Sequence, residues 1–186
     1  MIKQLLFVVL CAVVTVSVLA VTPANDSVGA KAVQTLKKNL QGALLKALGK
    51  GDVAQAIEVC STQAMALTAQ SGKVDPAIVS IERRTDKWRN PANRADSLDM
   101  QALQAFRKDR QLVELRLNES TSIMRYYQPL YTHSMCLQCH GDPAGFSADV
   151  RAALKERYPD DRATGYTENE LRGVIQVRIH QHSEER

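Results

Sequence analysis

Cys136-Leu137-Gln138-Cys139-His140 organises this chain of 186 residues. At the spacing C-x-x-C-H, two thiols can add to the two vinyl groups of a haem while the adjacent histidine stays beside the iron. The motif therefore predicts one covalent haem c, with thioethers at Cys136 and Cys139 and His140 as the proximal iron ligand. A zinc site would need a second ligand pair at usual spacing, which the sequence lacks, and a redox C-x-x-C does not need the trailing histidine.

The N-terminus predicts export from the cytoplasm. Lys3 precedes an almost wholly apolar run over residues 5–19, and Val18 and Ala20 provide small residues before a cleavage point. We expect residues 1–20 to be a signal peptide, with an uncleaved membrane anchor as the alternative. Residues 25–182 would then form a haem domain in the periplasm, touching a membrane only if the N-terminal segment is retained.

Removal of residues 1–20 would change the cysteine count. Cys11 would leave with the signal, so Cys60 would remain as an odd thiol beside the two cysteines of the motif. An unpaired thiol in an oxidising compartment calls for an explanation. Cys60 lies on the apolar stripe of an expected helix, which fits either an iron ligand or a small buried core residue.

The second axial ligand of the iron is not settled by the motif. No methionine follows Met135, and Met135 is too close to Cys136 to reach the opposite face of the haem. A water-bound or open iron site is one alternative. The protein candidates are Cys60, His133, Met65, Met100, Met124, His180 and His182.

Composition and charge limit the other functions. The length suits one domain with a real core. The formal net charge is only +4, and acidic residues are scattered among the basic ones, which argues against a nucleic-acid binder. Within the basic stretch 83–94, Arg83, Arg89 and Asn90 are candidates for contacts to the haem propionates, because arginine suits carboxylates. The alternative is a solvated loop.

Hydrophobic periodicity predicts a mixed α+β fold. Helical spacing covers residues 28–48 and residues 53–70, separated by a Gly-Lys-Gly break, so these segments should form an N-terminal helical hairpin. Further helices are expected at 98–106 and 149–157, and strands at 77–81, 112–117, 123–131 and 173–179. Residues 83–96 read as irregular. Helices followed by interspersed strands favour an antiparallel sheet.

Several short motifs, taken in order, resemble the Tll-like family of single-haem c-type proteins. The motifs lie at residues 56–60, 89–93, 126–130, 136–141, 158–166 and 171–173. The resemblance covers nearly the whole mature chain, with departures at residues 82–86 and 168–170. It implies a PAS-like antiparallel sheet flanked by helices, and a haem iron held between histidine and cysteine, which map onto His140 and Cys60.

A thiolate ligand donates strongly and favours ferric iron, so the expected function is low-potential electron transfer with a redox partner protein. The alternative is a redox or gas sensor that releases Cys60 and signals through a partner. An enzyme acting on sulfur compounds or peroxide ranks third, because no acid–base constellation converges near the motif. The oligomeric state is left open by the sequence.

Overall fold

The structure is a computed structural model that describes residues 27–49 and 53–181. The predicted signal or anchor segment 1–20, residues 50–52 between the first two helices and His182 lie outside the described residues. Within them, no helix is long and apolar enough to cross a membrane.

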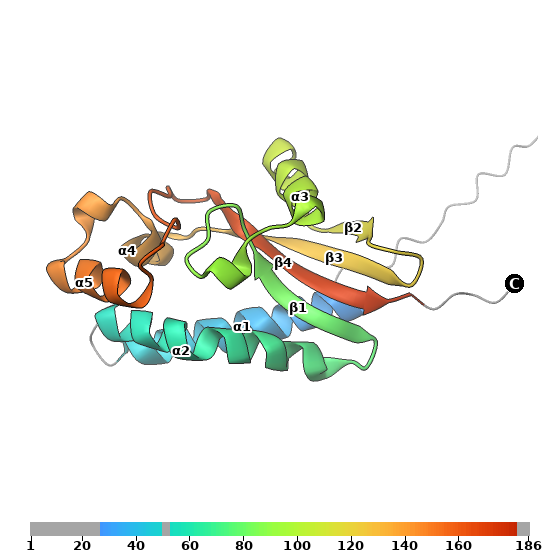
Figure 1. Cartoon of the computed structure of the whole chain (residues 1–186), viewed down its shortest axis with the longest axis horizontal. Helices are drawn as coiled ribbons and strands as arrows, with labels where there is room; N and C mark the ends of the chain where they lie inside the picture. Colours follow the sequence, from blue (N-terminus) through green and yellow to red (C-terminus); the bar gives the residue numbers. More distant parts are fainter. Residues whose placement is uncertain (1–26, 50–52, 182–186) are drawn as a thin grey trace, which may run out of the picture.

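Five α-helices and one four-stranded sheet make up the described chain (Figure 1). The sheet order is β1-β4-β3-β2, and every neighbouring pair is antiparallel. The predicted α+β class is therefore confirmed. In chain order the elements are α1 (Val28–Leu48), α2 (Val53–Ser71), β1 (Ile78–Arg84), α3 (Ser97–Lys108), β2 (Leu115–Asn118), β3 (Ile123–Tyr131), α4 (Leu137–His140), α5 (Ala148–Arg157) and β4 (Leu171–His180).

The two largest differences from the predicted boundaries are three residues each, and the short helix α4 was not predicted. β1 continues to Arg84, because Arg83 and Arg84 stay paired with Ile175 and Val174 of β4. Hydrogen bonds between strands join backbone groups and do not depend on the polarity of the side chains. The charged residues after Ile81 therefore gave no sign in the sequence that the strand continues. The strand expected from residue 112 begins only at Leu115, where pairing with Tyr127 starts.

The sheet is covered on both faces, which Figure 1 shows with α1 and α3 on opposite sides. Successive side chains of a strand point to opposite faces. Ile175, Val177 and Ile179 of β4 pack with α1, whereas Val174 packs with Phe106 of α3. The central strand β4 is thus apolar toward α1, whereas its face toward α3 combines the buried Val174 with the buried Gln176.

A buried carboxylate anchors α3 to the sheet. Asp99 is completely buried and accepts hydrogen bonds from the Tyr127 hydroxyl at 2.9 Å and from the Gln176 amide at 2.6 Å. The same side chain closes the capping box at the start of α3 with Asp96. The helix start and its position against β3 and β4 are therefore fixed by one residue.

A separate apolar cluster lies beyond one end of the sheet. Ile57 of α2 packs there with Phe146, Val150 and Leu154, which belong to α5 and the turn before it. Figure 1 shows α2 running past the sheet to meet α4 and α5. The C-x-x-C-H motif lies at this helical end, where Cys139 packs against the same cluster.

Candidate functional site

A cleft of about 930 Å³, including its open mouth, lies at the helical end. Cofactor pockets are commonly lined mainly by apolar groups with a few placed polar ones. α1 and α2 supply an apolar wall, and the motif and β-strand ends supply polar groups. The apolar wall consists of Leu44, Leu48, Val53, Ala56 and Ile57.

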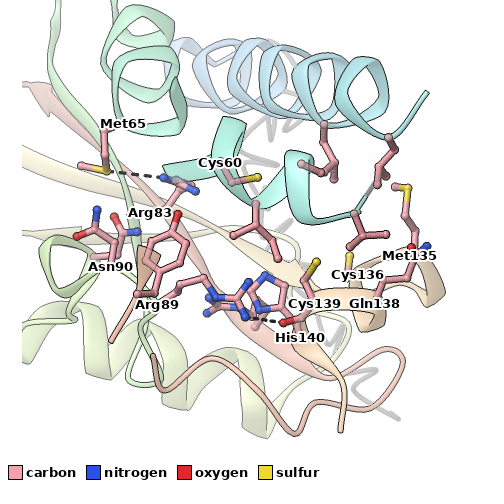
Figure 2. A pocket seen from close by; sticks show the side chains of 18 residues that line it. Cys60, Met65, Arg83, Arg89, Asn90, Met135, Cys136, Gln138, Cys139 and His140 are labelled. Atoms are coloured by element: carbon pink, nitrogen blue, oxygen red, sulfur yellow. Dashed lines mark hydrogen bonds between the residues drawn. The ribbon is translucent and has the colours of Figure 1, made fainter. Parts of the chain in front are cut away.

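The motif enters this cleft on a single helical turn. Cys136 immediately precedes α4, and Cys139 and His140 belong to it, so all three face the cleft (Figure 2). Gly141 follows with a φ of −74°, which any residue can adopt. A Cβ at this position would lie 2.6 Å from the Leu137 carbonyl oxygen, so the glycine is needed for space.

His140 is held in one tautomer. Its Nδ1 lies 2.7 Å from the carbonyl oxygen of Ala163, and a carbonyl can only accept, so Nδ1 carries the hydrogen and donates it. Nε2 is left with its lone pair. Burial, followed by the charges of Arg89 and Arg172, holds the pKa of His140 well below its usual value. A neutral imidazole with an oriented Nδ1–H is the form that binds a metal.

Cys60 reaches the cleft from α2. Ile57 and Ala64, on the same predicted stripe, are buried in the protein, whereas the Cys60 thiol is exposed along the cleft. Figure 2 shows this thiol projecting from α2, with the motif on another side of the cleft. Although Cys60 is open to the cleft, the cleft walls partly desolvate its thiol and raise its pKa, and the nearby Arg83 and Arg89 act in the opposite direction.

The structure separates the other candidates for the second axial ligand. Met65 lines the cleft, and its sulfur is 3.7 Å from Nη2 of Arg83. Met100 packs with the α3 side of the sheet, and Met124 packs with the α1 side. His133 and His180 are exposed and are not among the lining residues. Of the candidates within the described residues, Cys60 and Met65 therefore reach the cleft.

Two buried guanidinium groups in the cleft are incompletely bonded. Nε of Arg83 and Nε of Arg172 are both buried without a hydrogen-bond partner. Burial lowers the pKa of each side chain, and no carboxylate of the described residues forms an ion pair with either one. Such cations favour an anionic partner. Arg172 was missed in the sequence, where it is one polar residue at the start of an alternating strand.

Arg89 and Asn90 line the same cleft, but both are bonded within the protein. Arg89 donates from Nε to Asp161 Oδ2 at 3.0 Å and from Nη2 to the Cys139 carbonyl at 2.5 Å. Asn90 Oδ1 accepts from the backbone N–H of Ala92 at 2.9 Å and caps a short 3₁₀ turn. Both residues therefore organise the loop beside the motif.

The arrangement combines two adjacent thiols, a neutral imidazole with a free Nε2, a thiol on the facing helix and two buried cations. These groups suit a planar, acidic cofactor that carries a metal ion. Protein side chains alone form no metal site in the described part of the chain, where no cluster of three or more His, Cys, Asp or Glu residues could hold an ion.

Comparison with known proteins identifies the relatives of this chain. The model of the family described as Tll0287-like matches residues 16–180. The structure titled "Crystal structure of the cyanobacterial heme-protein Tll0287" matches with a TM-score of 0.61 and 24% sequence identity, over 82% of this chain and 92% of that one. No curated protein sequence matches significantly. Because the family model spans most of its length, the chain belongs to the Tll0287-like family.

Proposed function

We propose that this chain is an exported single-haem c-type cytochrome that transfers electrons at low potential, with His140 and Cys60 as axial ligands of the iron. The observation that carries the proposal is the state of His140, whose Nδ1–H is bonded to Ala163 and whose Nε2 is free in a cleft shared with Cys60. The solved relative is titled a heme-protein, which supports the same cofactor.

The residues of the cleft fit a haem on three counts. Cys136 and Cys139 would form the thioethers, and the apolar wall from α1 and α2 would cover the porphyrin. The incompletely bonded Arg83 and Arg172 would bind the two propionate carboxylates, for which bidentate guanidinium contacts are well suited. A bound haem supplies a one-electron couple, and a thiolate from Cys60 would lower its potential.

The N-terminal sequence supports export to the periplasm, where a c-type haem would be attached, and delivery of electrons would require a redox partner protein. A redox or gas sensor is the second candidate function. It is favoured by the position of Cys60 on α2, since Gly72, the residue directly after that helix, packs against Ile81 of β1. Release of Cys60 would then act on the sheet.

The test compares wild type with Cys60→Ala after expression with the haem-attachment machinery. Denatured wild type should retain the mass of one haem, and Cys136→Ser with Cys139→Ser should lose it. Cys60→Ala should change the ferric absorption and electron paramagnetic resonance spectra and raise the reduction potential, because an anionic ligand is removed.

Met65→Leu is the matched control, because it removes the other sulfur that α2 places in the cleft. Its ferric spectrum should equal that of wild type. An unchanged spectrum in Cys60→Ala would contradict the proposed ligation. Carbon monoxide separates the two functions: ready binding by reduced wild type favours a sensor, and no binding favours an electron carrier.

A further inference from the structure

We propose that Arg89 and Asp161 form a positioning pair that fixes the Nδ1–H hydrogen bond of His140 and thereby tunes the reduction potential of the haem. The inference rests on the proposed function, because the effect reaches the iron only if His140 is its ligand. It goes beyond that function by assigning a role to two residues that do not touch the metal.

Asp161 holds Ala163, the residue whose carbonyl accepts the hydrogen bond from His140. Its Oδ1 accepts from the backbone N–H of Ala163 at 2.8 Å, and its Oδ2 accepts from Arg89 Nε at 3.0 Å. The carbonyl of the same Ala163 accepts the Nδ1–H of His140 at 2.7 Å. One carboxylate therefore holds the peptide whose oxygen orients the imidazole.

Arg89 connects that peptide to the motif itself. Its Nη2 donates to the Cys139 carbonyl at 2.5 Å and lies 3.4 Å from the Ala163 carbonyl. The side chains of Arg89 and Asp161 are each only 11% exposed. Removing one member of such a buried pair is unfavourable, because the remaining charge is left uncompensated. The ring from Arg89 through Asp161, Ala163 and His140 to Cys139 is thus held at every step.

Two main-chain hydrogen bonds also connect the loop at residues 161–166 to the C-terminal end of α4. The Tyr166 N–H donates to the His140 carbonyl at 2.9 Å, and the Gly165 N–H donates to the Gly141 carbonyl at 2.8 Å. The loop at residues 161–166 is therefore docked onto α4 by main-chain bonds and by the ion pair together. Only the ion pair can be changed through side chains.

The direction of the shift in potential follows from the charge of Arg89. Its guanidinium lies between the Cys139 and Ala163 carbonyls, where a positive charge disfavours the more positive ferric form of the haem. Loosening of the His140 hydrogen bond weakens the donation of the imidazole to the iron and acts in the opposite direction. Loss of a full unit charge is the larger effect, so Arg89→Gln should lower the potential.

The experiment uses the protein with its haem attached. Nuclear magnetic resonance measures solvent exchange of the His140 Nδ1–H, and redox titration measures the potential. Arg89→Gln and Asp161→Asn should each accelerate the exchange at least tenfold. In Arg89→Gln the ratio of reduced to oxidised protein at fixed potential should fall about tenfold, which is ~59 mV for a one-electron couple.

Asp161→Asn separates positioning from charge. A purely electrostatic role predicts a higher potential with unchanged exchange of the Nδ1–H, whereas positioning requires faster exchange. Arg89→Lys keeps the positive charge, but a lysine cannot bond Asp161 and the Cys139 carbonyl at the same time as a planar guanidinium does. The His140 Nδ1–H in this variant should therefore exchange as fast as in Arg89→Gln. Wild-type exchange in these variants would overturn the proposal.

Arg162→Gln is the matched control. Arg162 neighbours Asp161, is exposed and stacks its guanidinium 4.4 Å from the Trp88 ring centroid, outside the ring of contacts. Its removal takes away the same charge and should leave the exchange at the wild-type rate; an equal acceleration would overturn the proposal. A wild-type protein with attached haem but without His140 ligation would instead contradict the proposed function.

Discussion

At the scale of single residues, the space around Gly141 decides how the motif is presented. The backbone there folds so tightly onto α4 that Gly141 donates its N–H to the Leu137 carbonyl at 2.9 Å. The carbonyl of Gly141 is also occupied, by the N–H of Gly165. The residue after His140 therefore touches backbone on both sides, and it cannot gain a side chain without moving one of them.

Gly141→Ala should consequently disturb the motif. The added Cβ would lie 2.6 Å from the Leu137 carbonyl oxygen, and a backbone atom cannot give way cheaply. We expect a loss of about 1–3 kcal/mol of stability, typical of overpacking, and a lower haem content. Urea unfolding and haem absorbance per protein measure the two effects.

Gly145→Ala is the control for this prediction, because nothing lies within 4 Å of a Cβ at Gly145. This variant should keep wild-type stability and haem content. Equal behaviour of the two alanine variants would show that the close approach at Gly141 does not constrain α4.

At the scale of elements, α1 is seated on the sheet through its first turn. Gly29 is buried against the ring of Tyr126, and that tyrosine is itself completely buried with its hydroxyl donating to Glu114 at 2.8 Å. The ring cannot swing away without breaking this bond. The position of α1, and with it the apolar wall of the cleft, depends on a helix residue that has no side chain.

Substitutions at two glycines of α1 should have opposite effects. In Gly29→Ala the Cβ would lie 2.5 Å from Tyr126 Cγ, and we expect a loss of about 1–3 kcal/mol. In Gly42→Ala the Cβ meets nothing within 4 Å, and better helix propensity should add about 0.5–1 kcal/mol. Chemical denaturation measures both, and destabilisation by Gly42→Ala would contradict the assignment.

Elements could be predicted because their signals are local. The periodicity of Val33, Leu36 and Leu40 predicts α1, and the alternation in residues 173–179 predicts β4; both are confirmed. The end of β1 was hidden, because Arg83 and Arg84 are polar while their pairing partners lie about 90 residues away along the chain. A ladder between distant segments leaves no mark in either one alone.

Part of the lining of the cleft could be predicted, because its signals in the sequence are local. The motif places Cys136, Cys139 and His140 on one turn, and the expected stripe on α2 leads to Cys60 in the same cleft. Arg172 and the Arg89–Asp161 pair could not be found in this way. Their roles depend on which carbonyl or carboxylate the fold brings opposite them, and arginines in a basic stretch look alike in sequence.

At the scale of the whole molecule, an ion cluster connects three strands at the end of the sheet opposite the cleft. Away from the cleft, Glu119 follows β2 and accepts from Arg178 of β4 at 2.5 Å and from Arg125 of β3 at 2.6 Å. These hydrogen bonds lower the pKa of Glu119 to about 2, with Arg178 as the largest cause. One carboxylate thus ties the edge strand β2 to the two central strands.

This ion cluster predicts an acid sensitivity. A lowered pKa in the folded state means that the stabilisation is complete above the unfolded pKa of about 4.3 and is lost as the pH falls towards 2. At pH 7 the free energy of unfolding of wild type should exceed that of Glu119→Gln by about 1 kcal/mol, a value that already allows for solvent screening. The difference should vanish near pH 2.

Urea unfolding at pH 7, 4.5 and 2.5 measures that difference, and comparison of the two proteins at the same pH cancels acid effects on the rest of the molecule. Glu156→Gln is the control. The Glu156 side chain is 73% exposed, and its ion pair with Arg157 Nε is long, at 3.7 Å, so its loss should change stability little at any pH. A stability gap between wild type and Glu119→Gln that does not narrow below pH 4.5 would show that Glu119 titrates normally.

Cys60 and His140 come from opposite halves of the chain, on α2 and α4. With both bound to one iron, the metal would act as a cross-link between the two halves. Closing a loop of this length, about 80 residues, removes chain entropy from the unfolded state that is worth about 4–5 kcal/mol in the loop-closure treatment of disulfides. Ligation by Cys60 would thus stabilise the fold in addition to its electronic effect, because it would cross-link the helical hairpin to the C-terminal half of the domain.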